Sequence, residues 1–149
     1  LSSLIVAATA LLLILPSRNV DGYSASKTES WIDVCHWIDG NVSNDAIVLA
    51  PRSSVTFRWY SSRAVYVTFK DCPQDAAGIL EWNRRLSIYQ DWASRSFEND
   101  KQFSEDELIE LVQLTQATHL LVSRMGPFER EPTHRNEHYR FYELPKIED

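Results

Sequence analysis

The sequence has few cysteines, few glycines and fewer basic than acidic residues. The cysteine count and the charge balance each argue against a class of protein. Its 149 residues include two cysteines, four glycines, and 15 basic against 21 acidic side chains. Two cysteines are too few for a disulfide framework, and Cys35 and Cys72 lack zinc-ligand spacing. The acidic balance argues against a nucleic-acid-binding protein. What remains is a chain of globular composition, long enough for one domain with a sizeable core.

Motifs for catalysis are missing too. The sequence contains no G-x-S-x-G turn and no glycine-rich phosphate loop. Its histidines are scattered, and the pair His134 and His138 falls in a segment without helical periodicity, so no metal site is expected. The sequence therefore predicts no catalytic residue, no metal and no cofactor, and it leaves open whether the chain is an enzyme.

The cysteines allow two interpretations. Cys35 falls on the apolar side of an expected helix, which favours a buried free thiol. A bridge between Cys35 and Cys72 is the alternative if the domain faces an oxidising compartment.

The longest apolar run is LIVAATALLLIL, residues 4–15, which carries no charge. It is shorter than the about 20 residues of a full membrane span, and no basic region precedes it as in a signal peptide. We expect residues 1–16 to be the end of a transmembrane helix; a signal sequence and a buried core helix are the alternatives. Residues 17–27 would then be a linker, and residues 28–149 a soluble α/β domain.

Short apolar runs alternate with helical periods through this domain. Helices are predicted from the capping box Ser26–Glu29 to Gly40, from Ser53 or Ser54 to Tyr60, from Asp71 to about Trp92, and from the capping box Ser104–Glu107. Strands are predicted at residues 46–50, 64–69 and 118–123, with 139–144 at an edge, and loops at 93–103 and 125–138. This order predicts an α/β fold of two or three layers around about four strands, mainly parallel.

Basic and hydroxyl side chains follow the first two expected strands. In open α/β sheets, ligands bind beyond the carboxyl ends of the strands, near helix amino termini. Those ends are APRSS, residues 50–54, and FKDCP, residues 69–73. The candidates for binding an anionic or glycan ligand are Arg52, Ser53, Ser54, Arg58, Arg63, Lys70 and Asp71. Solvation or pairing with acids is the alternative for the cations, and Asp71 is expected mainly to cap the following helix.

The segment from Trp31 to Leu86 resembles a C-terminal domain of multi-pass membrane proteins from bacterial and photosynthetic lineages. The shared pattern is W-x-x-x-C-x-W-I, an apolar strand, T-P, F-K-W, A-x-R, K-D-x-P-Q-D-A and E-W-x-R-R-L. Its counterparts are Trp31, Cys35, Trp37, Pro51, Phe57, Arg58, Trp59, Arg63, Lys70, Asp71, Pro73, Gln74, Asp75, Trp82, Arg84 and Arg85. The sequence departs from the pattern at Ala50 and Ser62, and its last third matches in outline only.

The resemblance implies a small α/β domain that follows many membrane helices, a layout similar to glycosyltransferases that use lipid-linked sugars. In those enzymes the catalytic acid lies in the multi-pass half, so no catalytic residue is carried over. We therefore expect a membrane-tethered accessory domain on the non-cytoplasmic side, in a periplasm or organelle lumen. It would assist binding of a lipid-linked sugar or another anionic ligand. The alternative is an interaction domain that docks onto another membrane-protein subunit and binds no small molecule.

Overall fold

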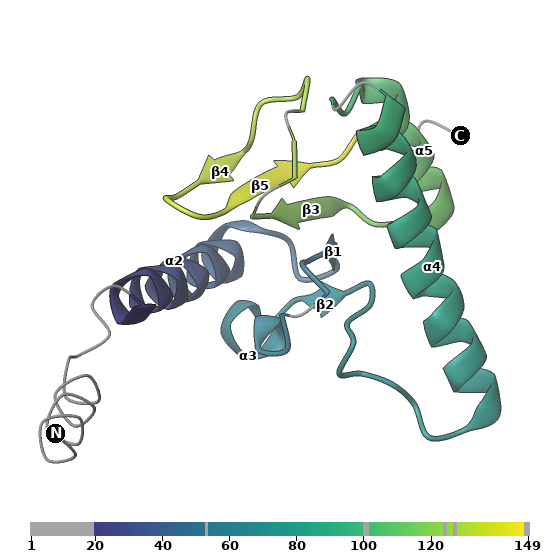
Figure 1. Cartoon of the computed structure of the whole chain (residues 1–149), viewed down its shortest axis with the longest axis horizontal. Coiled ribbons are helices and arrows are strands. Elements are labelled where there is room, and N and C mark those ends of the chain that lie inside the picture. The colour runs from purple at the N-terminus through teal and green to yellow at the C-terminus, as the bar shows by residue number, and fades with distance from the viewer. Residues whose placement is uncertain (1–19, 53, 100–101, 124, 127, 148–149) are drawn as a thin grey trace, which may run out of the picture.

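Helices cover both faces of a central sheet in the computed structural model, which describes residues 20–52, 54–99, 102–123, 125–126 and 128–147 (Figure 1). In chain order the elements are α2 (Val20–Asn41), β1 (Ile47–Leu49), α3 (Phe57–Ser61), β2 (Ala64–Val65), α4 (Ala76–Asn99), α5 (Glu105–Thr115), β3 (His119–Val122), β4 (His134–Arg135) and β5 (Arg140–Glu143). The fold is therefore α/β. The apolar run at residues 4–15 lies outside the described part, in which no helix is both long and apolar enough to cross a membrane.

The sheet is mixed and has five strands in the order β2-β1-β3-β5-β4. β1 pairs in parallel with β2 and β3, whereas β5 runs antiparallel to β3 and β4. The strand expected at an edge, β5, is thus an inner strand. The edge strand β4 comes from residues 125–138, which were predicted to be a loop. β4 contains only His134 and Arg135, so it has no apolar pattern that would predict a strand. It forms because this part of the chain lies antiparallel to β5.

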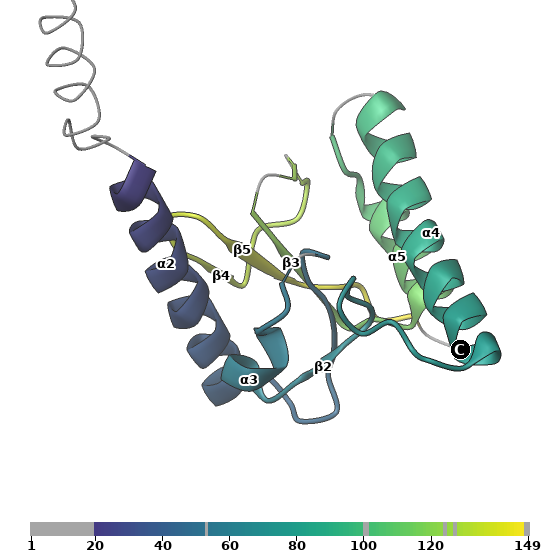
Figure 2. The same ribbon diagram turned by 60° about the horizontal axis from the view of Figure 1, so that its bottom comes forward.

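Successive side chains of each strand enter different cores, as the pleat requires. Leu49 and Leu120 pack into the core under α4 and α5, and their neighbours Val48 and Leu121 pack into the core under α2 and α3. Figure 2 shows the sheet between these two pairs of helices. The arrangement is the three-layer form of the predicted α/β fold.

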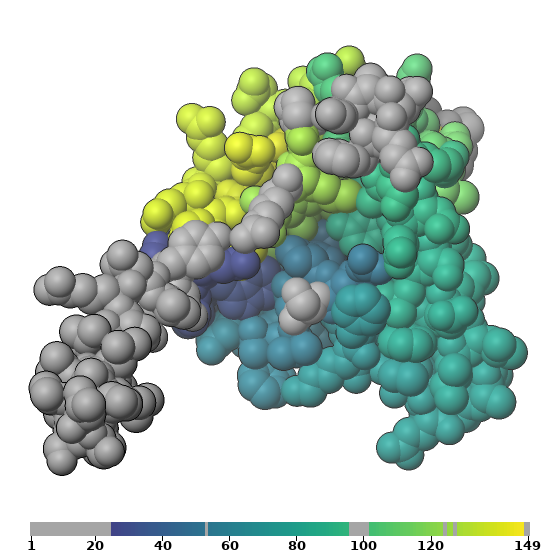
Figure 3. Space-filling view, in the orientation of Figure 1, coloured from purple at the N-terminus to yellow at the C-terminus, as the bar shows by residue number. Residues whose placement is uncertain are grey.

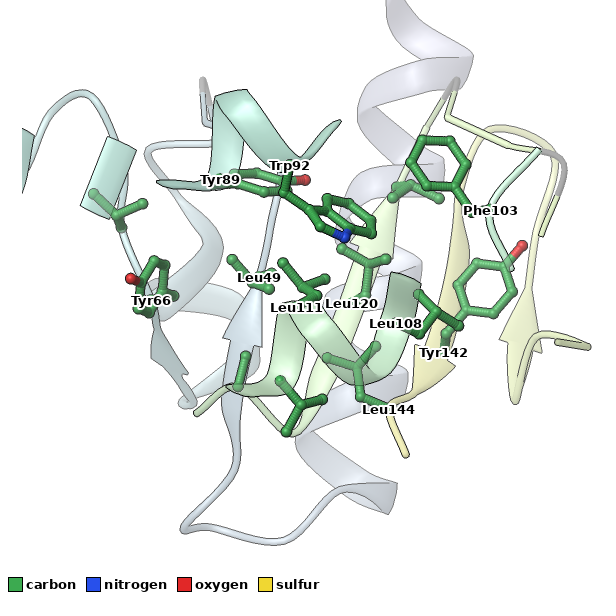
Figure 4. Packing of buried hydrophobic residues seen from close by; sticks show 14 of the residues in the cluster. Leu49, Tyr66, Tyr89, Trp92, Phe103, Leu108, Leu111, Leu120, Tyr142 and Leu144 are labelled. Carbon is green, nitrogen blue, oxygen red and sulfur yellow. The ribbon is translucent and has the colours of Figure 1, made fainter. Parts of the chain in front are cut away.

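Aromatic packing joins α4 to α5 on one face of the sheet. Trp92 is fully buried, lies between Tyr89 and Phe103, and donates its indole N–H to the Glu107 carbonyl at 2.7 Å (Figure 4). The helix was predicted to end near Trp92, but it runs to Asn99. Residues 93–99 contain neither glycine nor proline, so nothing in this polar stretch ends the helix.

The predicted helix starts have mixed outcomes. The capping box of Ser104 with Glu107 is confirmed at α5. α2 begins at Val20, so the predicted capping box of Ser26 and Glu29 is wrong, and residues 20–27 of the expected linker are helical. No proline interrupts α2, and the Ser26 hydroxyl donates instead to Glu137 at 2.8 Å.

Two shorter elements differ as well. α3 starts after Thr56 rather than after Ser53 or Ser54, and Ser53 lies outside the described residues. The Thr56 hydroxyl accepts a 2.9 Å hydrogen bond from the Trp31 indole and forms no helix cap. β2 covers only the first residues of the predicted strand at 64–69.

The two cysteines are both free. Cys35 is buried in the core under α2, as the helical pattern predicted, and Cys72 is exposed. Burial raises the pKa of the Cys35 thiol to about 12. The alternative of a Cys35–Cys72 bridge is therefore wrong.

Candidate functional site

A small hollow lies between α3 and the loop that follows β2. We call it the cation hollow; its volume is about 160 Å³, and its lining includes Ser54, Arg58, Trp59, Lys70 and Asp71. Both carboxyl-end segments that the sequence singled out contribute to it, together with the exposed face of α3. The structure thus brings four of the predicted site residues together and adds an aromatic side chain.

The Lys70 ammonium lies against an aromatic ring. Its Nζ lies 5.6 Å from the centroid of the Trp59 ring, and the Trp59 side chain is 74% exposed. Within the described residues, Lys70 forms no ion pair with a carboxylate. A cation held against an indole face keeps its charge while losing part of its hydration. Lys70 therefore presents positive charge to the hollow.

Asp71 is paired with Arg58 across the same hollow. Arg58 Nη2 lies 3.4 Å from Asp71 Oδ2, and the Thr68 hydroxyl donates to the same oxygen at 2.9 Å. Both charged side chains are about half exposed, so the ion pair contributes little to stability. This pairing directs the Asp71 carboxylate towards α3 rather than towards α4.

The predicted helix cap at Asp71 is therefore wrong. α4 begins at Ala76, and one of its first free N–H groups, that of Gly78, donates to Asp75 Oδ1 at 2.8 Å. The segment between Asp71 and Asp75 contains Pro73 and is not helical. Both acids precede the helix in the sequence, but only the later one is adjacent to its first turn.

Arg63 is a structural residue outside the hollow. Its side chain is about 5% exposed, and its guanidinium donates to the Val42 carbonyl at 2.6 Å and the Asp39 carbonyl at 2.7 Å. It also forms a 3.2 Å ion pair with the Asp39 carboxylate. Carbonyl groups at the end of a helix lack intrahelical donors. Arg63 supplies N–H donors to such carbonyl groups at the end of α2. This position does not fit its predicted role in ligand binding.

Arg52 belongs to a different hollow. Its Nη1 donates to Gln90 at 2.8 Å, and its guanidinium lies 5.0 Å from the centroid of the Phe69 ring. With Tyr89 and Phe103 it lines a hollow of about 470 Å³ next to α4. The prediction that Arg52 and Lys70 lie at one shared site is not supported, because they line separate hollows.

A third hollow adjoins the cation hollow, and the sequence analysis did not predict it. We call it the Tyr66 hollow; its volume is about 240 Å³, and its lining includes Tyr66, Glu81, Trp82 and Arg85. Arg58, Thr68 and Asp71 line both hollows, so the two are neighbours. The signal in the sequence was the E-W-x-R-R spacing, which places an acid and two arginines within one helical turn.

Charged groups on α4 form one wall of the Tyr66 hollow. Arg84 and Arg85 each donate to Glu81 at 2.7 Å, and these hydrogen bonds lower the pKa of its carboxyl group to about 2. The Trp82 indole N–H donates to the Thr68 carbonyl at 2.8 Å, which fixes the indole ring against the loop. The wall therefore combines an ionised carboxylate, a guanidinium and a positioned aromatic ring.

Both hollows lie within the part of the chain that is similar to a described family. A family model for a domain of unknown function, DUF6798, matches residues 29–88, from within α2 to within α4. This is less than half of the chain, and the description names no activity. No curated protein and no solved structure matches the chain.

Proposed function

We propose that this chain is a membrane-tethered accessory domain of a polytopic membrane protein, placed on the non-cytoplasmic side in a periplasm or organelle lumen. Its cation hollow would assist the parent protein in binding an anionic or glycan substrate such as a lipid-linked sugar. The observation that carries the proposal is Lys70, an ammonium without a carboxylate partner among the described residues, held against the exposed face of Trp59.

The charge of the hollow supports an anionic ligand. The whole chain has a formal net charge of -6, yet this hollow is lined by Arg58 and Lys70 against the single carboxylate of Asp71. An ammonium acts as a compact point charge for phosphate, and a guanidinium adds directed donors. The indole ring of Trp59 holds the Lys70 ammonium at the hollow, where it can meet a phosphate.

Asp71 supports binding by positioning Arg58. Its Oδ2 pairs with the Arg58 guanidinium and accepts from the Thr68 hydroxyl, which holds the guanidinium at the edge of the hollow. The proposal therefore gives the hollow a role in holding substrate and leaves the reaction to another part of the parent protein.

A binding experiment on the full chain in detergent tests the role of Lys70. Glucose 1-phosphate and inorganic phosphate are titrated by calorimetry, with glucose as the neutral comparator. Lys70→Ala should weaken binding of both phosphates about tenfold, the loss of one charge-assisted hydrogen bond. Its free energy of unfolding should change by less than ~0.5 kcal/mol, as for other exposed substitutions.

Lys146→Ala is the matched control, because it removes the same charge from a side chain that is 88% exposed and does not line the cation hollow. It should leave binding unchanged. Equal binding by the Lys70 and Lys146 variants would remove the basis of the proposal.

The membrane tether has a separate test. A chain lacking residues 1–18 should fold with an unchanged melting temperature and leave the membrane fraction, because α2 begins after the deleted segment. If this variant unfolds, residues 4–15 belong to the core and the tether is wrong.

An interaction domain that docks onto another membrane-protein subunit is the second candidate. It is favoured by exposed apolar side chains, Trp59 at 74% and Leu80 at 72%. Leu80 lies in the amino-terminal turns of α4, which extend beyond the rest of the domain at the lower right of Figure 3. If this second candidate is right, Leu80→Ser should disrupt the parent complex and leave phosphate binding unchanged. If the leading proposal is right, Lys70→Ala should weaken phosphate binding and leave the parent complex intact.

A further inference from the structure

The Tyr66 hydroxyl is a buried polar group without a hydrogen-bond partner among the described residues. The Tyr66 residue is 7% exposed, and its ring lies 5.3 Å from the Arg85 guanidinium. Nearly all buried side-chain polar atoms in native structures have a partner, because leaving one unpaired costs about 1–3 kcal/mol. Tyr66 also lines the Tyr66 hollow, so a group bound in that hollow is the nearest candidate for the missing partner.

Tyr66 lines the same hollow as Glu81 and Arg85 of α4. Burial raises the pKa of Tyr66, and the positive charges of Arg84 and Arg85 oppose that rise. Arg85 Nη1 also donates to the Tyr66 carbonyl at 3.4 Å, so α4 and the end of β2 are joined at this point. The backbone and the ring of Tyr66 are thus held beside the Glu81–Arg85 pair.

The chemistry of the hollow fits a ring that carries several hydroxyl groups. The Glu81 carboxylate accepts hydrogen bonds, Arg85 donates them, and Tyr66 can do either. Trp82 contributes an aromatic wall whose indole N–H is already bonded to the Thr68 carbonyl. An aromatic surface flanked by charged donors and acceptors satisfies both the apolar face and the hydroxyl groups of a sugar.

The sizes of the two hollows indicate a ligand with two small parts. The Tyr66 hollow measures about 240 Å³ and the cation hollow about 160 Å³. Each is smaller than the roughly 300–1,000 Å³ typical of drug-sized ligands. Arg58 and Asp71 line both, so a ligand that filled the two hollows would lie against this ion pair.

We infer that the Tyr66 hollow is a sugar subsite, that the ligand is a sugar phosphate with its phosphate in the cation hollow, and that the Tyr66 hydroxyl bonds a sugar hydroxyl. This inference rests on the proposed function and specifies its substrate class. Tyr66 is a binding residue in this arrangement and takes no part in a reaction.

Tyr66→Phe in the full chain tests the inference, because it removes the hydroxyl and keeps the ring. The melting temperature should stay the same or rise, since no hydrogen bond is lost. Binding of glucose 1-phosphate, measured by calorimetry, should weaken five- to tenfold. Binding of inorganic phosphate, which has no sugar ring, should not change.

Tyr89→Phe is the matched control. It removes a hydroxyl from another buried tyrosine, which lines the separate hollow beside Arg52. It should leave the affinity for both probes unchanged.

Two results would overturn the sugar subsite alone: unchanged binding of glucose 1-phosphate by Tyr66→Phe, or an equal loss for both probes. In either case, a selective loss of phosphate binding in Lys70→Ala still supports the proposed function. If the unmodified chain binds neither probe, both the proposed function and the sugar subsite are wrong.

Discussion

The Asp75 carboxylate accepts a 2.8 Å hydrogen bond from the backbone N–H of Gly78 in the first turn of α4. This contact fixes where the helix begins and therefore how its wall of Glu81, Trp82 and Arg85 faces the Tyr66 hollow. It also leaves Asp71 available to pair with Arg58 in the cation hollow.

Asp75→Ala should lower the free energy of unfolding by about 0.5–2 kcal/mol, the usual loss for a helix amino-terminal cap. Asp71→Ala should lower it by less than about 1 kcal/mol, because the ion pair it breaks is exposed. Urea denaturation of both variants measures the difference. A larger loss for the Asp71 variant would contradict the assignment of the cap.

Gly78 allows the loop before α4 to approach the helix closely. A Cβ at this position would lie 2.7 Å from the Pro73 Cβ and 2.7 Å from Asp75 Oδ2. Gly78→Ala should therefore destabilise the fold by about 1–3 kcal/mol, as other overpacked substitutions do.

Gly40→Ala is the matched control, because a Cβ there meets nothing within 4 Å. This variant should be as stable as the unmodified chain or up to about 1 kcal/mol more stable, since alanine restricts the unfolded chain. Equal melting temperatures for the two alanine variants would show that the loop does not constrain Gly78.

Arg63 holds the end of α2 through a buried guanidinium. Arg63→Ala should destabilise the fold by about 1–3 kcal/mol, because the partly buried carbonyl groups of Asp39 and Val42 would lose their donors. Arg63→Lys should recover only part of this loss, since an ammonium cannot reproduce the planar fork. Full recovery with lysine would indicate that charge alone is needed, and denaturation curves distinguish the two results.

His119 should make stability depend on pH. Its ring stacks on Phe141 with centroids 5.1 Å apart, and burial lowers its pKa below 6.5, although the Glu143 charge opposes this. The unfolded chain therefore binds a proton at His119 more readily than the folded chain does. Stability should be full above pH 6.5 and decline as the pH falls towards the lower folded pKa.

His119→Gln should flatten this decline between pH 7 and pH 5, relative to the unmodified chain. The other histidines remain in both proteins, so the difference between the two pH profiles reports His119. Parallel profiles would show that His119 does not contribute. Melting temperatures measured across this range supply the comparison.

Features whose causes lie within a few residues were predictable from the sequence. The apolar runs of β1 and β3 follow from their β-branched and leucine composition, and the capping box of Ser104 with Glu107 closes within one turn of α5. The buried position of Cys35 follows from the helical period of α2 in the same way.

Features that depend on partners distant in the sequence were decided by the tertiary structure. β5 is an inner strand because β4 returns beside it, and Arg63 is buried because the end of α2 packs against its guanidinium. In the sequence, Arg63 and Lys70 are both basic residues next to an expected strand. In the structure, the Arg63 guanidinium donates to backbone carbonyl groups, whereas the Lys70 ammonium lies against the Trp59 ring.

The site itself divides in the same manner. Composition and order determined an α/β chain with basic and hydroxyl residues after its first two strands. Which of them share a hollow was decided only when α3, the loop after β2 and α4 packed together, since these contacts join side chains that no local hydrogen bond or period relates. The Tyr66 hydroxyl, which has no partner within the described part of the chain, belongs to this second group, because hydrogen-bond satisfaction is a property of the packed molecule and not of the sequence around the residue.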